Sequence, residues 1–377
     1  MNRKAIRRGL VRLTAAAVIA FAAVSALAQG GDVSISKRAV DGFVYVMTNA
    51  ASGNSVIQFG RSVNGRLTKV HEESTQGLGS GGMLDPLTSQ NSLVLGAGGR
   101  FLLAVNAGSD ELSLLRASRN GLRFVNKVAS GGDFPNSVAH FEGLVYVLNR
   151  DSANIAGFRV CLPGGTFEPI ANSVVALPGG AGSAPADIRF SPDGAWLAVT
   201  QTAANQIVLF PIDADGAPGT PVVTPAEGVG AFGFAFRADG TLIVTEAMSA
   251  SASSYSVASD GTLDAISAAV PDGQAATCWV SLTPGGDVAF VSNTAAANLS
   301  SYAVGADGEL TLEEDVTGAL PAGSAPIDSA MSRDGRYLYV IDSVNGRVIV
   351  YNVHGAKLTK VDAVTGLPVS IQGIAAR

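Results

Sequence analysis

Short apolar runs recur seven times along the chain, and each has the same polar borders. A glycine precedes each run, and a carboxamide or carboxylate residue closes it six or seven positions later. Successive closing residues are 57, 43, 52, 45, 47 and 49 positions apart. A repeat of this length, built from short strands, is typical of a β-propeller with one four-stranded blade per repeat. The closing residues are Asn49, Asn106, Asn149, Gln201, Glu246, Asn293 and Asp342.

Each repeat divides into four predicted strands. An inner strand leads to an Asp-Gly turn, as in residues 188–194, and a second strand follows, as in residues 196–199. A third, alternating strand, as in residues 348–351, runs into a tight hairpin before the fourth. Asn-Gly and Asp-Gly pairs suit such hairpins because both central residues of a type I′ turn need positive φ. The hairpin pairs are Asn64-Gly65, Asn120-Gly121, Gly164-Gly165, Asp215-Gly216, Asp260-Gly261, Asp307-Gly308 and His354-Gly355.

The two ends of the repeat array complement each other. The first repeat starts at Gly42 with its second strand, whereas the last repeat ends with a surplus strand-like segment over residues 368–374. We predict that this segment forms the inner strand of blade one, because closing the ring removes two exposed sheet edges. The sequence thus predicts an all-β, seven-bladed β-propeller as a single domain over residues 29–377. A β-sandwich or a pair of barrels is disfavoured, because the same signals recur in the same order.

The first 28 residues have the pattern of a signal peptide. A basic segment over residues 3–12 precedes an apolar segment over residues 13–26, and Ala26-Leu27-Ala28 matches a small-residue cleavage site. Arg7-Arg8 leaves the twin-arginine and general secretory routes both open. We therefore expect a periplasmic or secreted protein. Cleavage would reduce 25 basic residues to 20 against 31 acidic ones, so the mature charge is −11.

Charge and hydropathy exclude some partners. A strongly acidic exported protein is a poor ligand for nucleic acid or anionic lipid. No other apolar run approaches the length of about 20 residues that a membrane span needs. We expect a monomer that binds a small molecule or a protein. Cys161 and Cys278 fall in different repeats, on predicted strands too far apart for a disulfide.

Ligands of propellers bind at the mouth of the central channel, where loops converge. We expect the site where the inner strands begin. Asp187 and Asp328 occupy the same place in two repeats, and two carboxylates facing one channel could activate water or bind Ca²⁺. Capping of each blade by its own aspartate is the structural alternative. The other candidates are ligand-binding Asn91, Asn136, Cys278, Trp279, Ser370 and Gln372.

Other chemistry lacks its sequence signature. The chain has no Gly-x-Ser-x-Gly elbow, zinc-ligand cluster, Walker loop or dinucleotide fingerprint, so we predict no metal site and no cofactor. The closing residue of each repeat is expected to be structural, since a role needed seven times supports the fold. The Gly-rich segment over residues 77–86 accounts for the long first interval, and either a functional loop or a flexible connector would explain it.

The motifs resemble those of the bacterial lactonase-like seven-bladed propeller family, which includes 6-phosphogluconolactonase and a carboxymuconate cyclase. The resemblance is carried by residues 87–109, by residues 134–149, and by the repeat motifs Ser191-Pro192-Asp193-Gly194 and Tyr339-Val340-Ile341-Asp342. It spans residues 42–375 and implies a propeller fold with the site at the channel mouth. It also implies hydrolysis of a sugar lactone or a related cyclic ester.

The chain departs from this family at a position that matters for catalysis. Family members often carry a Pro-His pair on an inner strand, and the corresponding positions here hold no histidine. His71, His140 and His354 fall elsewhere and are expected at the surface. A cyclase-like reaction would need channel-facing arginines, and Arg189 and Arg237 lie on inner strands. Two functions stay open: an exported lactone hydrolase, or a non-catalytic propeller that binds a small ligand or a protein.

Overall fold

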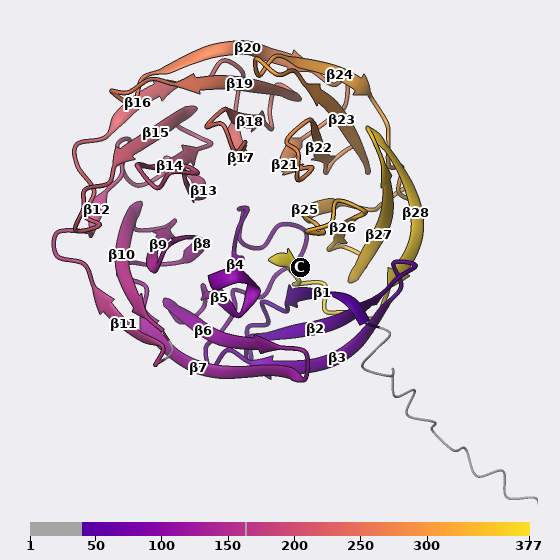
Figure 1. Ribbon diagram of the computed structural model, residues 1–377, viewed down its shortest axis with the longest axis horizontal. Coiled ribbons are helices and arrows are strands. Elements are labelled where there is room, and N and C mark those ends of the chain that lie inside the picture. The colour runs from indigo at the N-terminus through magenta and orange to yellow at the C-terminus, as the bar shows by residue number, and fades with distance from the viewer. Residues whose placement is uncertain (1–39, 163) are drawn as a thin grey trace, which may run out of the picture. The chain divides into compact units, whose positions relative to one another are not determined.

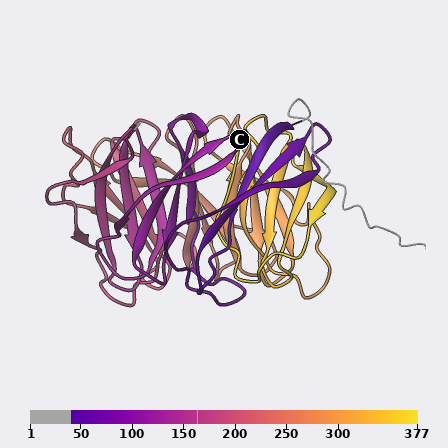
Figure 2. The same ribbon diagram turned by 90° about the horizontal axis from the view of Figure 1, so that it is seen from below.

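The computed structural model describes residues 40–162 and 164–377, so the predicted signal peptide lies outside the described residues. Seven antiparallel sheets follow one another around a central axis (Figure 1). Their strands run roughly along that axis (Figure 2). The predicted seven-bladed β-propeller is therefore confirmed. Besides its strands, the described part contains the short 3₁₀ helix η1 (Ala97–Gly99).

Each blade is ordered from an inner strand beside the axis to an outer strand at the rim. From blade one to blade seven, the inner strands are β29 (Ile374–Ala376), β4 (Leu93–Gly96), β8 (Pro135–Phe141), β13 (Pro185–Phe190), β17 (Ala231–Phe236), β21 (Thr277–Leu282) and β25 (Pro326–Met331). The second strands are β1 (Val40–Met47), β5 (Phe101–Asn106), β9 (Leu144–Asn149), β14 (Trp196–Gln201), β18 (Leu242–Glu246), β22 (Val288–Asn293) and β26 (Tyr337–Asp342).

The third strands complete the buried part of each blade, and the fourth strands cover it. The third strands are β2 (Ser55–Ser62), β6 (Glu111–Ser118), β10 (Asn154–Cys161), β15 (Gln206–Pro211), β19 (Ser251–Val257), β23 (Asn298–Val304) and β27 (Arg347–His354). The fourth are β3 (Leu67–Ser74), β7 (Gly121–Ala129), β11 (Thr166–Pro169), β16 (Val222–Pro225), β20 (Leu263–Pro271), β24 (Leu310–Glu314) and β28 (Lys357–Val364). In blade three, β12 (Val175–Ala176) also pairs with β10.

Burial follows this order. The second strands are almost wholly buried, because the faces of neighbouring blades pack against both of their sides. The outer strands expose many residues, as the pattern of β28 shows. The core consequently consists of apolar clusters within and between blades, and the inner strands are left to line the axis.

The C-terminal strand closes the ring as predicted, with a shifted boundary. β29 pairs with β1, with Ile374 opposite Val46 and Ala376 opposite Val44. The strand covers Ile374–Ala376, whereas the sequence suggested residues 368–374. The difference arises because the preceding residues turn toward the axis, where the Ser370 hydroxyl donates to the carbonyl of Thr48 at 2.8 Å.

Candidate functional site

Five of the inner strands are irregular at their first residues. In blades three to seven the pairing of inner and second strands shifts register there, for example between Pro135 and Ser137 and between Pro185 and Asp187. Such bulges redirect side chains and recur next to functional sites. At one end of the channel, the bulges interrupt the regular alternation of side chains between the two faces of the strand, at residues such as Asn136 and Asp187.

That end of the channel is filled by the segment between blades one and two. Residues 85–91, here called the channel plug, follow the Gly-rich stretch and enter the middle of the ring beside β4 (Figure 1). The side chain of Gln90 pairs with the backbone of Val280 like a short strand, through Nε2 to the carbonyl at 2.7 Å and through Oε1 to the N–H at 3.3 Å. The Gln90 N–H donates to the carbonyl of Ala186 at 3.1 Å. The plug thus joins blades four and six across the axis.

Several predicted ligand-binding residues serve this plug. Trp279 is 1% exposed, and its Nε1–H donates to the carbonyl of Ser89 at 2.8 Å, so its ring presents no face to the channel. Gln372 donates to the same carbonyl at 2.8 Å and accepts from the N–H of Leu87 at 2.8 Å. Asn136 donates to the carbonyl of Pro185 at 2.9 Å. These donors therefore bond the protein itself, while Asn136 Oδ1 has no partner, and Ser370 bonds Thr48 as described above.

The carboxylate of Asp187 connects the plug to blades three, four and five. Its Oδ1 accepts from Asn91 Nδ2 at 2.8 Å and from the Ser137 hydroxyl at 3.3 Å. Its Oδ2 accepts from Arg189 Nε at 3.1 Å and from the N–H of Phe234 at 3.2 Å. Burial raises the pKa of Asp187, and the Arg189 charge and these donors act in the opposite direction. Because all four contacts are donors, the site is built around the ionised carboxylate.

Asp187 in turn positions Arg189. The guanidinium of Arg189 lies over the ring of Phe234, 5.7 Å from the centroid, and its side chain is 26% exposed. Its Nη2 has no hydrogen-bond partner in the structure. Arg237, which was expected on an inner strand, lies one residue beyond the end of β17, where it donates to the carbonyl of Gly305 at 2.7 Å and pairs with Asp239 at 3.2 Å. Arg189 is therefore the inner-strand arginine that the structure turns toward the axis.

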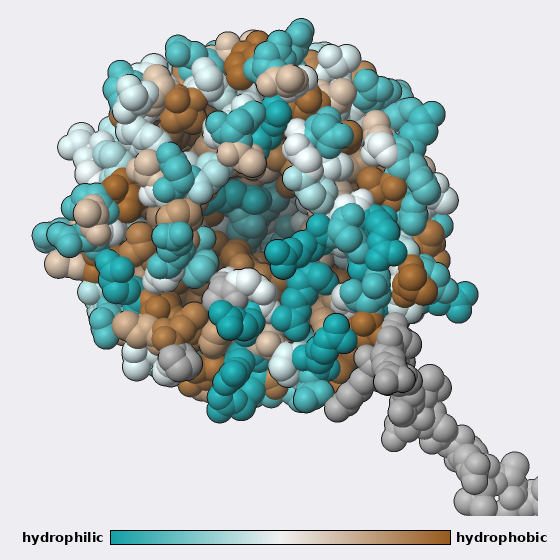
Figure 3. Space-filling view, in the orientation of Figure 1, coloured by the Kyte–Doolittle hydropathy of each residue, from teal (hydrophilic) through white to brown (hydrophobic). Residues whose placement is uncertain are grey.

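A cavity of about 320 Å³ lies beyond the plug, at the end of the channel where the inner strands finish. Gln90, Asn91 and Arg189 contribute polar groups, together with the hydroxyls of Ser281 and Ser329. Arg189 is the one charged residue among those that line it in the described part of the chain. The space-filling view shows a hollow at the centre of this face with hydrophilic residues at its bottom (Figure 3). The open site thus lies at the opposite end from the predicted mouth.

Asp328 and Asp85 lie close to this cluster. Asp328 is 3% exposed, and burial together with the charge of Asp187 raises its pKa to about 8, while Arg189 acts to lower it. Burial also raises the pKa of Asp85 to about 7, against a hydrogen bond of 2.8 Å from Gln372. The two predicted carboxylates therefore differ: Asp187 is fully hydrogen-bonded as an anion, and Asp328 is held largely protonated at neutral pH.

The remaining polar candidates have structural roles or lie away from the axis. Closing residues of the repeats bond their own blades; for example, Asn106 donates to the Ser113 hydroxyl at 2.8 Å. His354 is exposed, whereas His140 is half-buried beside Arg189 and not at the surface as predicted. Cys161 and Cys278 are not bonded to each other. In the described ranges, no three His, Cys, Asp or Glu side chains gather as a metal site.

This arrangement, a closed ring of seven blades around a polar channel, defines a seven-bladed β-propeller with an axial cavity. A family model described as "Lactonase, 7-bladed beta-propeller" matches residues 41–177, 162–280 and 272–376. The chain belongs to this family. No curated protein sequence matches it.

Solved structures show the same fold at low sequence identity. The periplasmic gluconolactonase of Pseudomonas aeruginosa is 19% identical with a TM-score of 0.70, over 88% of this chain and 98% of that one. A candidate 6-phosphogluconolactonase of Bacteroides fragilis is 19% identical with a TM-score of 0.70, over 89% and 97%. A protein of Lactobacillus plantarum is 19% identical with a TM-score of 0.71, over 89% and 98%.

No helix among the described residues is long and apolar enough to be a transmembrane segment.

The sequence indicated part of this site and missed the segment that organises it, the channel plug. The plug residues Gln90 and Asp85 were not among the candidates, although the long first interval marked residues 77–86, which include Asp85. Arg189 was noted, but its direction depends on bulges and on the plug, which the residue pattern does not reveal.

Proposed function

We propose that the axial cavity binds a small, oxygen-rich anion of the sugar-acid class without turning it over. The observation that carries the proposal is Arg189, the one charged residue that lines the axial cavity in the part of the chain that the structure describes. Family membership and the gluconolactonase named among the similar structures support the choice of ligand class.

The setting of Arg189 suits anion binding. A guanidinium recognises carboxylate or phosphate through paired N–H donors, and fixing it beforehand reduces the entropy lost on binding. Asp187 accepts from Nε at 3.1 Å, and Nη2 is buried without a partner, so a ligand would bind through Nη1. Asn91, Ser281 and Ser329 add groups that can hydrogen-bond the hydroxyls of a polyhydroxylated molecule.

Isothermal titration calorimetry with D-gluconate tests this directly. Arg189→Gln should weaken binding at least tenfold, because it removes the charge while keeping a similar length. Arg237→Gln is the matched control: it removes an arginine that points away from the cavity, and it should bind D-gluconate as the unchanged protein does. Equal affinities of the two variants would contradict the proposal.

Asp328 favours hydrolysis as a second candidate function. A pKa of about 8 leaves a fraction of this carboxylate ionised at neutral pH and able to accept a proton from water. The water oxygen would then attack the lactone carbonyl, the ring C–O bond would break, and the ring oxygen would receive a proton. Binding without turnover is the better-supported function, since Asp328 is buried and does not itself line the cavity.

Rates of δ-gluconolactone ring opening separate the two functions. We expect purified protein to leave the uncatalysed rate unchanged between pH 6 and 8. An acceleration that is lost in Asp328→Asn, with D-gluconate binding retained, would instead establish the hydrolase.

We also propose that the protein acts outside the cytoplasm. The proposal rests on the basic, apolar and small-residue segments of the first 28 residues. N-terminal sequencing of the mature protein from a periplasmic fraction should give Gln29 as its first residue. Recovery of the full-length chain in the cytoplasmic fraction would contradict it.

A further inference from the structure

One inter-blade junction differs from its counterparts on the face that carries the open cavity. In blades four, six and seven, the turn after the inner strand contains a glycine that approaches the preceding blade closely. A Cβ atom added to Gly194 would lie 2.2 Å from the ring of Phe141. At Gly240 of blade five, an added Cβ would meet nothing within 4 Å. The glycines of blades six and seven also meet the preceding blade: Gly286 faces Arg237 at 3.2 Å and Gly335 faces Pro284 at 3.0 Å.

The gap has a local cause in blade four. Ser191 stands where blade three has Phe141 at the end of its inner strand and blade five has Arg237 one residue beyond its own. The Ser191 hydroxyl folds back onto its own turn, where it donates to Asp193 Oδ1 at 2.6 Å and accepts from the N–H of Trp196 at 3.0 Å. A small, retracted side chain therefore leaves the junction of blades four and five unfilled.

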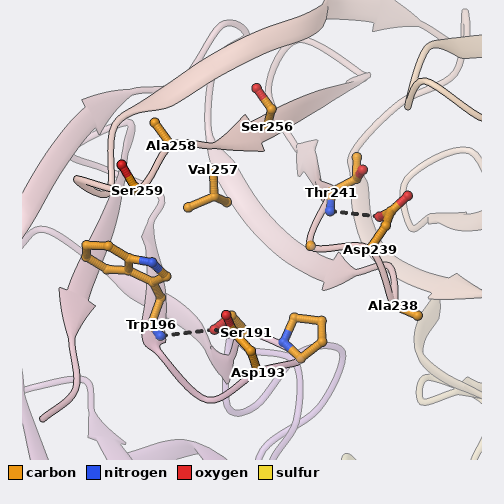
Figure 4. A pocket seen from close by; sticks show the side chains of 12 residues that line it. Ser191, Asp193, Trp196, Ala238, Asp239, Thr241, Ser256, Val257, Ala258 and Ser259 are labelled. Carbon is orange, nitrogen blue, oxygen red and sulfur yellow. Dashed lines mark hydrogen bonds between the residues drawn. The ribbon is translucent and has the colours of Figure 1, made fainter.

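The result is a pocket of about 560 Å³ at the surface. Its volume falls within the range of about 300–1,000 Å³ typical of small-molecule sites. Figure 4 shows Trp196 and Asp193 on one side of it, Asp239 and Thr241 on the other, and Val257 between them. The hydroxyl-bearing Ser256 and Ser259 also line it.

Trp196 provides a fixed, partly exposed aromatic surface. Its six-membered ring packs against Gly261, where an added Cβ would lie 2.6 Å from Cζ3 and Cη2. The side chain is half-buried, and the indole borders the pocket (Figure 4). A rigid aromatic surface beside polar groups suits a ligand that has one apolar and one hydroxylated side.

The carboxylates of the pocket are held by their own turns. Asp193 Oδ1 accepts from Ser191 and from the N–H of Ala195 at 3.1 Å, and the Ser191 hydroxyl and this N–H keep the pKa of Asp193 low. The charge of Asp239 is paired with Arg237 at 3.2 Å. The lining therefore combines one unpaired carboxylate with hydroxyl groups, a mixture suited to a neutral polyol more than to a cation.

We propose that this pocket, between blades four and five, is a carbohydrate-binding site for a neutral saccharide. The apolar face of a pyranose would stack on Trp196, and its hydroxyls would bond Asp193 and the serine hydroxyls. The site is separate from the axial cavity and independent of the function proposed for it. It would bring the protein to a sugar-containing surface or polymer.

Saturation-transfer NMR and titration with methyl β-D-glucopyranoside, methyl α-D-mannopyranoside and cellobiose test the proposal. At least one of the three should bind and change the emission of Trp196, because the other tryptophan, Trp279, is buried. Trp196→Ala should weaken that binding at least tenfold, while Trp196→Phe should weaken it only a few-fold.

A second variant guards against misfolding of Trp196→Ala. Ala238→Trp places a large side chain in the pocket from an exposed position and should also weaken binding at least tenfold. Arg189→Gln, in the axial cavity, should leave it unchanged. The proposal is overturned if none of the three saccharides binds, if binding survives Ala238→Trp, or if tetramethylammonium binds there in their place.

Discussion

The two ends of the central channel are built from the same seven inner strands, but one end is filled and the other is open. Where the inner strands begin, the channel plug fills the axis, and Gln90 joins blades four and six by 2.7 and 3.3 Å contacts to Val280 and a 3.1 Å bond to Ala186. Where they finish, a cavity of about 320 Å³ is left with Arg189 at its wall. One inserted segment therefore decides which end of a nearly symmetric ring can receive a ligand.

The two ends of the channel also differ in what their polar side chains contact. At the plugged end, the side chains of Gln90, Trp279 and Gln372 bond the protein itself, as buried polar groups generally must, although Asn136 Oδ1 has no partner. At the open end, Arg189 lines the cavity with a side chain that is 26% exposed, and its buried Nη2 has no partner. The residues that a ring-shaped fold brings together at one end of the channel can thus support the fold, while the open cavity lies at the other end.

The largest expected effect comes from forcing the plug outward. Gly233→Ala would place a Cβ atom 2.2 Å from Gln90 Oε1 and 2.6 Å from the carbonyl of Cys278. We expect the free energy of unfolding to fall by about 3 kcal/mol, as for overpacked cores. Urea denaturation measures it. Gly164→Ala, whose nearest atom would be 3.9 Å away, is the control and should be nearly neutral. Equal losses in both variants would mean that the plug does not press on blade five.

Asp328 gives the next largest effect, and it depends on pH. Its pKa is about 8 in the folded protein and near 3.8 when unfolded, so the folded state keeps a proton that the unfolded state has lost between these values. Stability from this group is full below pH 4 and declines as pH rises toward 8. Asp328→Asn mimics the protonated acid and should be more stable than the unchanged protein at pH 8.

Thermal unfolding at pH 4, 6 and 8 measures this difference. The gap between the variant and the unchanged protein should widen with pH. Asp260→Asn, at an exposed hairpin turn, should show no such widening. A gap that is constant with pH would mean that Asp328 is ionised throughout.

The smallest effect concerns the plug's own side chain. Gln90→Ala removes both contacts to the backbone of Val280 and should cost about 1–2 kcal/mol, because a buried N–H and carbonyl lose their partner. Asn120→Ala, at an exposed hairpin, serves as the control in the same denaturation assay. A neutral Gln90→Ala would show that water replaces the amide without loss.

The fold could be predicted from the sequence because its determinants are local and repeated. Glycine turns, apolar runs and closing carboxamides recur seven times, and the surplus C-terminal strand pairs with β1 through Ile374 and Ala376. The boundary was misjudged because residues 368–373 continue the strand-like pattern while serving the channel instead.

The site could be predicted only in part, since it depends on contacts between distant residues. Asp187 and Asn91 were both candidates, and the structure brings them together at 2.8 Å. Trp279 looked equally suitable, yet its indole bonds the carbonyl of Ser89, 190 positions away along the chain. No periodic pattern encodes such a contact, because the plug occurs once and breaks the repeat.

A crystal structure of the protein soaked with D-gluconate tests the central claim most directly. The account predicts electron density in the axial cavity, with the carboxylate of the ligand on the guanidinium of Arg189 and the plug unmoved. Ligand density at the plugged end of the channel, or an empty axial cavity at saturating D-gluconate, would contradict it.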